Sequence, residues 1–226
     1  RWYWGATSGM FDVLQSRYGF PKENIVFLFC DTHKDDTRVD YPATKANLRH
    51  TFAQLAERMQ PGDTLFGFFV GHGNRAGEGS YFELTDGRLL DHELDLLRRK
   101  IVATEQTYVF TPCNSGGFAS ALGPRAGTIV ITSCTVAEKN VAGFAEAIRD
   151  ALNHAPGADA DDDGRVSIGE VYNFALLRVI QWHEKRGRPL AEHCQIEDNA
   201  DGKSSYGRLP TTEHGANAFR RFVADD

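Results

Sequence analysis

Four short, nearly continuous apolar runs, separated by segments with helical periodicity, constrain the fold of this chain more than any other feature. The runs are rich in β-branched and aromatic residues and span 25–30, 64–70, 108–112 and 128–132. Such a run is typical of a strand buried on both faces, as strands in a parallel sheet are. The pattern predicts a three-layer α/β domain with a mostly parallel central sheet flanked by helices.

The segments between these runs carry apolar residues at helical spacing. In one of them, apolar residues recur at steps of four, three and four before a Pro-Gly pair: Leu48, Phe52, Leu55 and Met59. We expect three further helices, over 91–100 with Asp91 as the cap, over 144–152 and over 168–183. The Asp86-Gly87 pair predicts a hairpin over 81–90, preceded by a mobile glycine-rich loop over 73–80.

Composition excludes several classes of protein. The chain has 226 residues, 41% of them hydrophobic, and a formal net charge of −6. This length and apolar content predict one domain over 1–185. The segment over 186–226 is polar, glycine-rich and weakly periodic, which predicts an irregular tail packed on that domain. No apolar run approaches the roughly 18 residues of a membrane helix. The longest basic stretch is the triplet 98–100, so we expect neither a nucleic-acid nor a membrane partner.

Two residues with catalytic potential follow neighbouring predicted strands. His72 lies between two glycines after the run 64–70, and Cys113 follows the run 108–112 and precedes Asn114-Ser115-Gly116-Gly117. The carboxyl ends of parallel strands meet at one edge of a sheet. There, histidine can act as base and then acid for a thiol nucleophile. We expect the N–H groups of Gly73 and Cys113 to form an oxyanion hole, because neither should lie within a strand ladder.

The motifs around these residues resemble those of legumain-like, caspase-fold cysteine peptidases. The resemblance rests on Val70-Gly71-His72-Gly73, on the stretches 110–117 and 129–134, and on two segments similar to prokaryotic members, 19–25 and 159–170. It extends from about Phe11 to Gly202. It implies an endopeptidase that forms a thioester acyl-enzyme, with Cys113 as nucleophile, His72 as acid/base and a peptide or protein as substrate.

The sequence departs from the legumain pattern where the substrate side chain binds. Legumains that cut after Asn have an Arg-His pair near the start of the chain and an acidic residue two before the cysteine; Tyr3-Trp4 and Thr111 stand here. These differences argue against asparaginyl specificity and against an acidic pocket built from Thr111. The resemblance still makes Thr111, Trp4 and Glu138 candidate substrate-binding residues. In legumains an Asn orients the catalytic histidine, and that Asn would align near Arg1. The first strand of the family's sheet would precede Arg1.

An acidic segment over 159–170 has the spacing of a twelve-residue calcium loop. Its candidate ligands occupy positions 1, 3, 5, 7, 9 and 12, with the main-chain oxygen of Arg165 at position 7: Asp159, Asp161, Asp163, Arg165, Ser167 and Glu170. Gly164 stands at position 6. We therefore expect a single, structural calcium site. A second acidic run over 197–202 lacks the final carboxylate, because Arg208 stands at position 12, and is interpreted as a turn.

Two other functions remain open at this point. A catalytically inactive caspase-fold module could bind or regulate a partner, and a calcium-dependent adhesion or scaffold protein would also use the acidic loop. Four cysteines in 226 residues are too sparse for a disulfide framework. The sequence does not decide the cellular compartment of the protein, and a secreted or periplasmic location is slightly favoured over a cytoplasmic one. The sequence does not decide between a monomer and a dimer.

Overall fold

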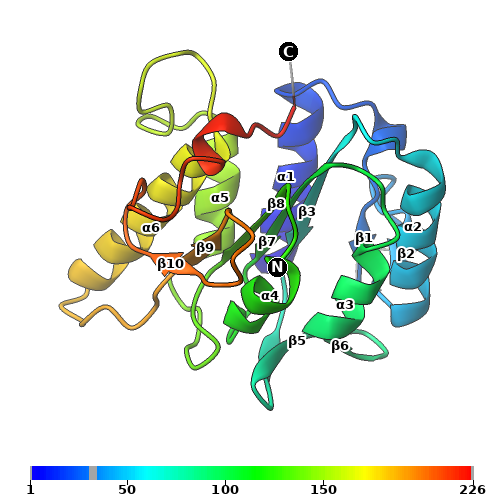
Figure 1. Cartoon of the computed structure of the whole chain (residues 1–226), viewed down its shortest axis with the longest axis horizontal. Coiled ribbons are helices and arrows are strands. Elements are labelled where there is room, and N and C mark those ends of the chain that lie inside the picture. Colours follow the sequence, from blue (N-terminus) through cyan, green and yellow to red (C-terminus); the bar gives the residue numbers. More distant parts are fainter. Residues whose placement is uncertain (1, 31–34, 225–226) are drawn as a thin grey trace.

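The computed structural model describes residues 2–30 and 35–224, and it has the expected three-layer α/β architecture (Figure 1). Its central sheet has five strands in the order β10-β9-β8-β7-β3. These are β3 (Thr64–Phe69), β7 (Glu105–Phe110), β8 (Thr128–Thr132), β9 (Gln195–Glu197) and β10 (Ser205–Tyr206). Strands β3, β7 and β8 run parallel; β9 pairs with β8 in antiparallel orientation, and β10 pairs with β9 in antiparallel orientation.

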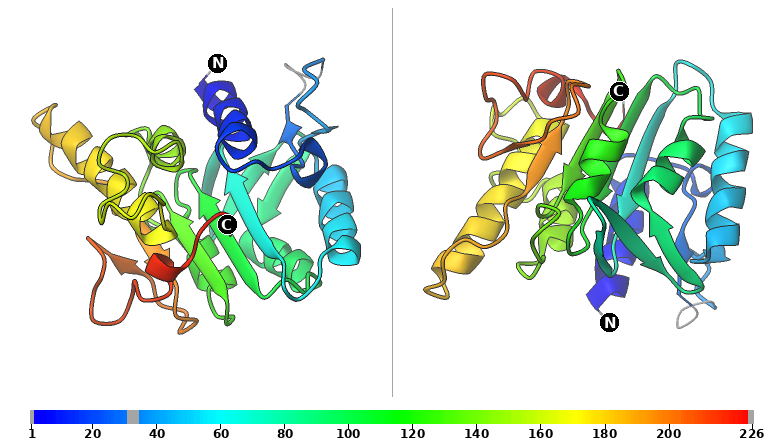
Figure 2. Two further views of the ribbon diagram at one scale, coloured as in Figure 1. Left: turned by 90° about the horizontal axis from the view of Figure 1, so that it is seen from above. Right: turned by 60° about the horizontal axis from the view of Figure 1, so that its bottom comes forward.

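Helices cover both faces of the sheet. One face is covered by α1 (Trp2–Ser16), α5 (Phe144–Leu152) and α6 (Ile168–Glu184), and the other by α2 (Lys45–Arg58), α3 (Asp91–Arg98) and α4 (Gly116–Leu122). The two views in Figure 2 separate these helical layers. Alternate residues of β7 enter the two cores, because Val109 packs with the first set of helices while Tyr108 and Phe110 pack with the second.

A short antiparallel sheet follows β3 in the chain. It consists of β4 (Gly73–Ala76), β5 (Gly79–Leu84) and β6 (Gly87–Leu90). The predicted hairpin is present, but the expected mobile loop over 73–80 is wrong, because most of that segment is paired in β4 and β5. Asp91 is also not the cap of α3. It is the first residue of that helix, and its Oδ2 accepts the N–H of Ser80 at 2.7 Å.

Strand β3 is the edge strand of the central sheet, and all six of its residues are half-buried. The predicted strand over 25–30 is reduced to β1 (Leu28–Phe29), which pairs with β2 (Tyr41–Pro42) in a separate parallel sheet. Three aromatic residues, Phe11, Phe27 and Phe29, form a small core beneath α1. Two short 3-10 helices, η1 (Lys22–Asn24) and η3 (Ala218–Arg220), complete the described elements.

Helix α1 was not expected from the sequence. Its first eight residues, Trp-Tyr-Trp-Gly-Ala-Thr-Ser-Gly, include residue types with low intrinsic helix propensity. Burial of Met10 and Val13 in the core beside α5 stabilises the helix in place of propensity. Strands β9 and β10 were also missed, because they lie in the weakly periodic segment after residue 186.

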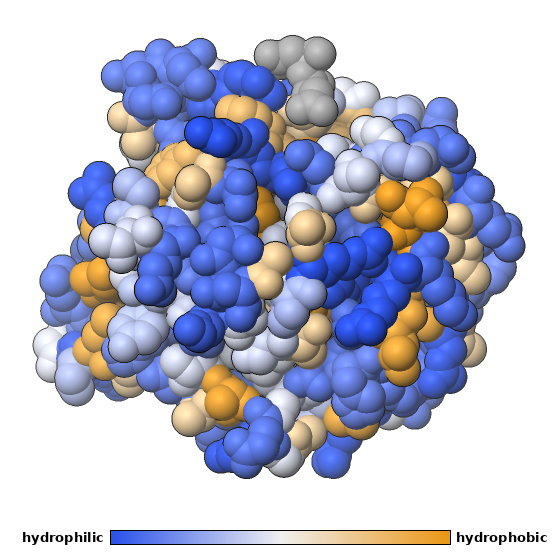
Figure 3. Space-filling view, viewed as in Figure 1, coloured by the Kyte–Doolittle hydropathy of each residue, from blue (hydrophilic) through white to orange (hydrophobic). Residues whose placement is uncertain are grey.

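The surface is mixed in character. The face in Figure 3 is largely hydrophilic with scattered apolar patches, and the exposed large apolar residues lie on different elements, among them Leu96 on α3 and Leu177 on α6. Within the two described ranges, every helix is too short or too polar to cross a bilayer.

Candidate active site

His72 and Cys113 lie at the same edge of the central sheet and at the same register. Phe69 and Phe110, the last residues of β3 and β7, are paired, and His72 and Cys113 each follow three residues later. Neighbouring strands of a sheet are about 4.8 Å apart. Because both chains leave the sheet at its carboxyl edge with the same offset, the histidine and the cysteine emerge side by side. The side chain of His72 is exposed and that of Cys113 is half-buried.

Gly73 brings the two strand ends into contact. A Cβ atom at Gly73 would lie 2.8 Å from the Cβ of Pro112 and 3.1 Å from the carbonyl oxygen of Cys113. Contrary to expectation, Gly73 belongs to a strand ladder, where it opposes Phe82. The adjacent His72 carbonyl accepts the Glu83 N–H at 2.9 Å. Hydrogen-bonded and non-bonded pairs alternate in an antiparallel ladder, so the N–H of Gly73 still points away from β5.

The turn that carries Cys113 is held on both sides. Asn114 has a φ of 58°, a conformation that asparagine tolerates better than most residues. Its N–H donates to the Glu138 carbonyl at 2.7 Å, and its side-chain amide donates to the Val136 carbonyl at 2.9 Å. On the other side, the buried hydroxyl of Ser80 donates to the Asn114 carbonyl and accepts the N–H of Gly117 at 2.9 Å. Cys113 is thus fixed by its neighbours.

Asn140 links the loop after β8 to this turn, and the sequence carried no signal for it. Its carbonyl accepts a weak hydrogen bond from Cys113 Sγ at 3.8 Å. Its side-chain amide donates to the Thr111 carbonyl at 2.5 Å. One residue therefore contacts the main chain before the cysteine and the sulfur itself.

Tyr3 is the second site residue that sequence reasoning missed. Its hydroxyl lies 3.1 Å from Nδ1 and 3.2 Å from Nε2 of His72. Burial raises the pKa of Tyr3, and the negative charges of Cys113 and Glu83 raise it further. The phenol therefore stays protonated at neutral pH. The Tyr3-Trp4 pair was compared with the legumain pattern, but only the helical conformation shows which of the two rings reaches the histidine.

The three predicted substrate-binding residues occupy different environments. Thr111 is only 2% exposed, and its hydroxyl donates to the Phe69 carbonyl at 3.2 Å, which leaves no exposed surface to contact a substrate. Trp4 packs beside Phe27 and Phe29 in the core beneath α1 and not toward His72. The residue expected near Arg1 lies outside the described residues.

Glu138 is the predicted substrate-binding residue that borders the site. Its carboxylate accepts the N–H of His193 at 2.9 Å and that of Thr135 at 3.1 Å, and it contacts His193 Nδ1 at 2.5 Å. Burial opposes ionisation of Glu138, but these hydrogen bonds outweigh it and lower the pKa of the carboxyl. The main-chain oxygen of Glu138 supports the cysteine turn, whereas its side chain is bound to His193.

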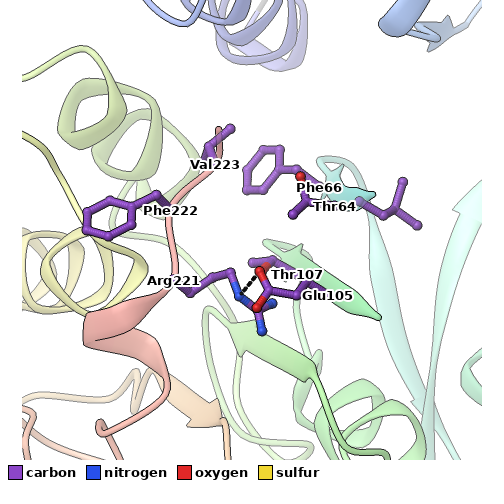
Figure 4. Close-up of a pocket in the computed structure, with 8 residues that line it drawn as sticks. Thr64, Phe66, Glu105, Thr107, Arg221, Phe222 and Val223 are labelled. Atoms are coloured by element: carbon purple, nitrogen blue, oxygen red, sulfur yellow. Dashed lines mark ion pairs between the residues drawn. The ribbon is translucent and has the colours of Figure 1, made fainter. Parts of the chain in front are cut away.

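A surface hollow of about 500 Å³ is lined by Trp2 and Val141, the sequence neighbours of Tyr3 and Asn140, and by residues of α5 and α6 such as Trp182. Trp2 is 46% exposed and Val141 is 56% exposed. A second, narrow hollow lies at the opposite, amino-terminal edge of the sheet, where Arg221 forms an ion pair with Glu105 at 2.8 Å (Figure 4). That hollow is remote from His72 and Cys113.

The acidic loop before α6 brings three of its six predicted ligands together. Ligand oxygens of Asp159, Asp161 and Glu170 lie within 4.8 Å of one another. Asp159 Oδ1 is buried without a hydrogen-bond partner, so this oxygen is free to bind a cation. Desolvation raises the pKa of Asp161, and the charges of Glu170, Asp163 and Asp159 raise it further. The donor set therefore fits a hard cation such as calcium.

The other predicted ligands make local contacts. Ser167 caps α6 by accepting the N–H of Glu170, and the Glu170 carboxylate in turn accepts the N–H of Ser167 at 2.8 Å. Asp163 accepts the N–H of Arg165 at 2.8 Å. The run over 197–202 forms a turn around Glu197, as expected, and Glu197 Oε1 accepts the N–H groups of Asn199 and Asp201.

Comparison with known proteins identifies a family that part of this chain resembles. Residues 6–117, just under half of the chain, match the model of the family described as metacaspase, peptidase C14 domain. The matched segment contains both His72 and Cys113. The first part of the chain is therefore similar to a caspase-like cysteine peptidase family. The likeness to legumains and to prokaryotic members stays a prediction.

Individual relatives support the same family. The chain is 34% identical to Metacaspase-1 of Eremothecium gossypii in an alignment that covers 46% of this chain. It is 31% identical to Metacaspase-4 of Arabidopsis thaliana in an alignment that covers 48% of this chain. It spans 26% and 28% of those two proteins, about a quarter of the curated relatives it matches. The crystal structure of protein GSU0716 from Geobacter sulfurreducens aligns with a TM-score of 0.51 and 15% identity, covering 81% of each chain. That likeness concerns the fold alone.

Proposed function

We propose that this protein is a cysteine endopeptidase in which Cys113 is the nucleophile and His72 the general acid/base. The observation that carries the proposal is the shared register of the two residues, together with the contact between Gly73 and the Pro112-Cys113 turn. The metacaspase match over residues 6–117 supports it independently. The inactive-module alternative has no observation in its favour.

The reaction follows from the groups at the edge of the sheet. His72 removes the thiol proton of Cys113, and the thiolate attacks the carbonyl carbon of the scissile peptide bond. The N–H groups of Gly73 and Cys113 stabilise the negative charge on the oxygen of the tetrahedral intermediate. His72 then returns the proton to the leaving amine, and the C–N bond breaks to give a thioester. Water, deprotonated by His72, hydrolyses the thioester and regenerates the thiol.

A calcium ion in the loop 159–170 is part of the proposal. Asp159, Asp161 and Glu170 would hold it, with the Arg165 carbonyl and the oxygens of Asp163 and Ser167 completing the coordination. Calcium bound there would neutralise the clustered carboxylates and fix the start of α6. The contacts described above for the cysteine turn all come from residues outside 159–170, so we assign the ion a structural role.

Single substitutions test the catalytic assignment. Cys113→Ala and His72→Ala should each reduce cleavage of a mixed peptide library at least ~1000-fold, because each removes a group that acts in every turnover. Cys30→Ala and His50→Ala, which lie outside the site, serve as controls and should keep wild-type turnover. Substantial activity in Cys113→Ala would reject the nucleophile. Wild-type protein that binds peptides without turnover would favour the inactive module.

A further inference from the structure

Tyr3 makes a specific contact with the imidazole of His72. The hydroxyl oxygen is nearly equidistant from the two ring nitrogens, at 3.1 and 3.2 Å, and the rings meet edge to face with centroids 5.2 Å apart. Within residues 2–30 and 35–224, no other side chain hydrogen-bonds this ring. An oxygen nearly equidistant from both nitrogens lies over the face of the imidazole, and a rotation about the Cβ–Cγ bond of His72 would bring one nitrogen into line with the hydroxyl.

The first turn of α1 holds Tyr3 in place. Trp4, the next residue, is fixed between aromatic rings, since its ring stacks on Phe27 at 5.8 Å and meets Phe29 edge-on at 5.0 Å. The hydroxyls of Thr7 and Ser8 donate to the carbonyls of Tyr3 and Trp4, at 2.8 and 2.7 Å. Tertiary packing of α1 thus presents the phenol to the histidine before any substrate binds.

A neutral phenol in this position can control which nitrogen of His72 faces the sulfur. The hydroxyl can form a hydrogen bond with only one ring nitrogen at a time, as donor or as acceptor. The partner of one nitrogen sets the tautomer and leaves the other nitrogen for the reacting group. An exposed histidine without such a partner would sample several ring orientations, and only some of these would face Cys113.

We propose that Tyr3 is a positioning residue for His72: its hydroxyl binds one ring nitrogen and thereby presents the other to Cys113. The inference rests on the proposed function, because it assigns Tyr3 a role only if His72 activates the thiol. In this inference, the group that orients the histidine is a residue of the described chain, and it lies on the first turn of α1.

The Tyr3→Phe variant removes the hydroxyl and keeps the ring. The main measurement is the rate of Cys113 alkylation by iodoacetamide between pH 5 and 9, with peptide mapping to separate Cys113 from Cys30. We expect Tyr3→Phe to react about tenfold more slowly than wild type near pH 6, where thiolate depends on the histidine. The kcat should fall by a similar factor with little change in KM, because ground-state binding is untouched.

A matched control and a second measurement separate positioning from folding. Tyr41→Phe, which removes a phenol hydroxyl on β2, should leave the alkylation profile unchanged. In wild type and Tyr3→Phe, the imidazole titration of His72 followed by NMR should differ, while the melting temperatures should agree. A Tyr3→Phe profile and titration that superimpose on wild type would overturn the inference, whatever the change in melting temperature.

The same experiment distinguishes failure of the proposed function from failure of the positioning role of Tyr3. If wild-type Cys113 reacts no faster than Cys30 at pH 6, the thiol is not activated, and both the dyad and the role of Tyr3 are rejected. If wild-type Cys113 is activated and Tyr3→Phe behaves identically, the dyad stands and only the positioning role falls.

Discussion

Gly73 lies so close to Pro112 that a Cβ atom on the glycine would stand 2.8 Å from the Cβ of the proline. The same atom would lie 2.6 Å from the Tyr81 carbonyl oxygen. This contact joins the chain leaving β3 to the chain leaving β7. The spacing between His72 and Cys113 therefore depends on the absence of a side chain at Gly73.

Gly73→Ala should disturb the site more than the fold. The added methyl group must push the two strand ends apart, which we expect to reduce kcat/KM by about 100-fold, the effect of a displacement of roughly 1 Å. Overpacking should lower the free energy of unfolding by about 1–3 kcal/mol. Steady-state kinetics and urea denaturation measure the two effects. Gly62→Ala, where a Cβ meets open space, is the control and should change neither. Unchanged kinetics in Gly73→Ala would show that the two strand ends are not in contact.

Asn140→Asp tests the link between the β8 loop and the cysteine turn. The carboxylate keeps the size of the amide but cannot donate to the Thr111 carbonyl, so two acceptors would face each other. We expect a loss of about 1–3 kcal/mol in the free energy of unfolding and a lower rate of Cys113 alkylation. Asn199→Asp, which removes an exposed amide hydrogen bond to the Glu213 carbonyl, should have a smaller effect. Equal effects of the two variants would argue against a special role for Asn140.

The Glu138–His193 contact predicts a pH dependence of stability. The folded state lowers the pKa of Glu138 below its ordinary value of 4.5, so the carboxylate stabilises the fold above that value. This contribution is lost as the pH falls through the lowered pKa. The difference in melting temperature between wild type and Glu138→Gln should therefore be largest above about pH 5 and shrink toward pH 3. Glu57→Gln, an exposed change on α2, is the control. A difference that grows toward low pH would contradict the assignment.

Calcium should stabilise the protein through the loop over 159–170. At a concentration of 100 times Kd, a ligand bound only by the folded state adds about 2.7 kcal/mol, measured as a rise in melting temperature. Asp161→Asn should reduce this rise strongly, because Asp161 belongs to the converging carboxylates. Asp162→Asn makes the same change in charge at a neighbouring position outside that group. Equal losses in the two variants would indicate a general effect of charge, and no rise in wild type would exclude the site.

The elements whose burial follows a simple pattern could be predicted from sequence. The strand Thr128–Thr132 and the helix Phe144–Leu152 have the predicted bounds, because every residue of the strand is buried and the helix has one apolar face. The positions of His72 and Cys113 after neighbouring strands of the central sheet could also be predicted, since residues that follow parallel strands emerge at one edge.

Tertiary structure alone decided which residues surround those two. Tyr3 and Asn140 lie 69 and 27 positions from the residues they contact, and no local pattern links residues so far apart. Helix α1 forms against its own propensity because it is packed on the core, and Thr111 is turned inward by a hydrogen bond to β3. Local periodicity thus specified the layers of the fold and the two strand ends, whereas contacts between distant segments determined how the site around them is built.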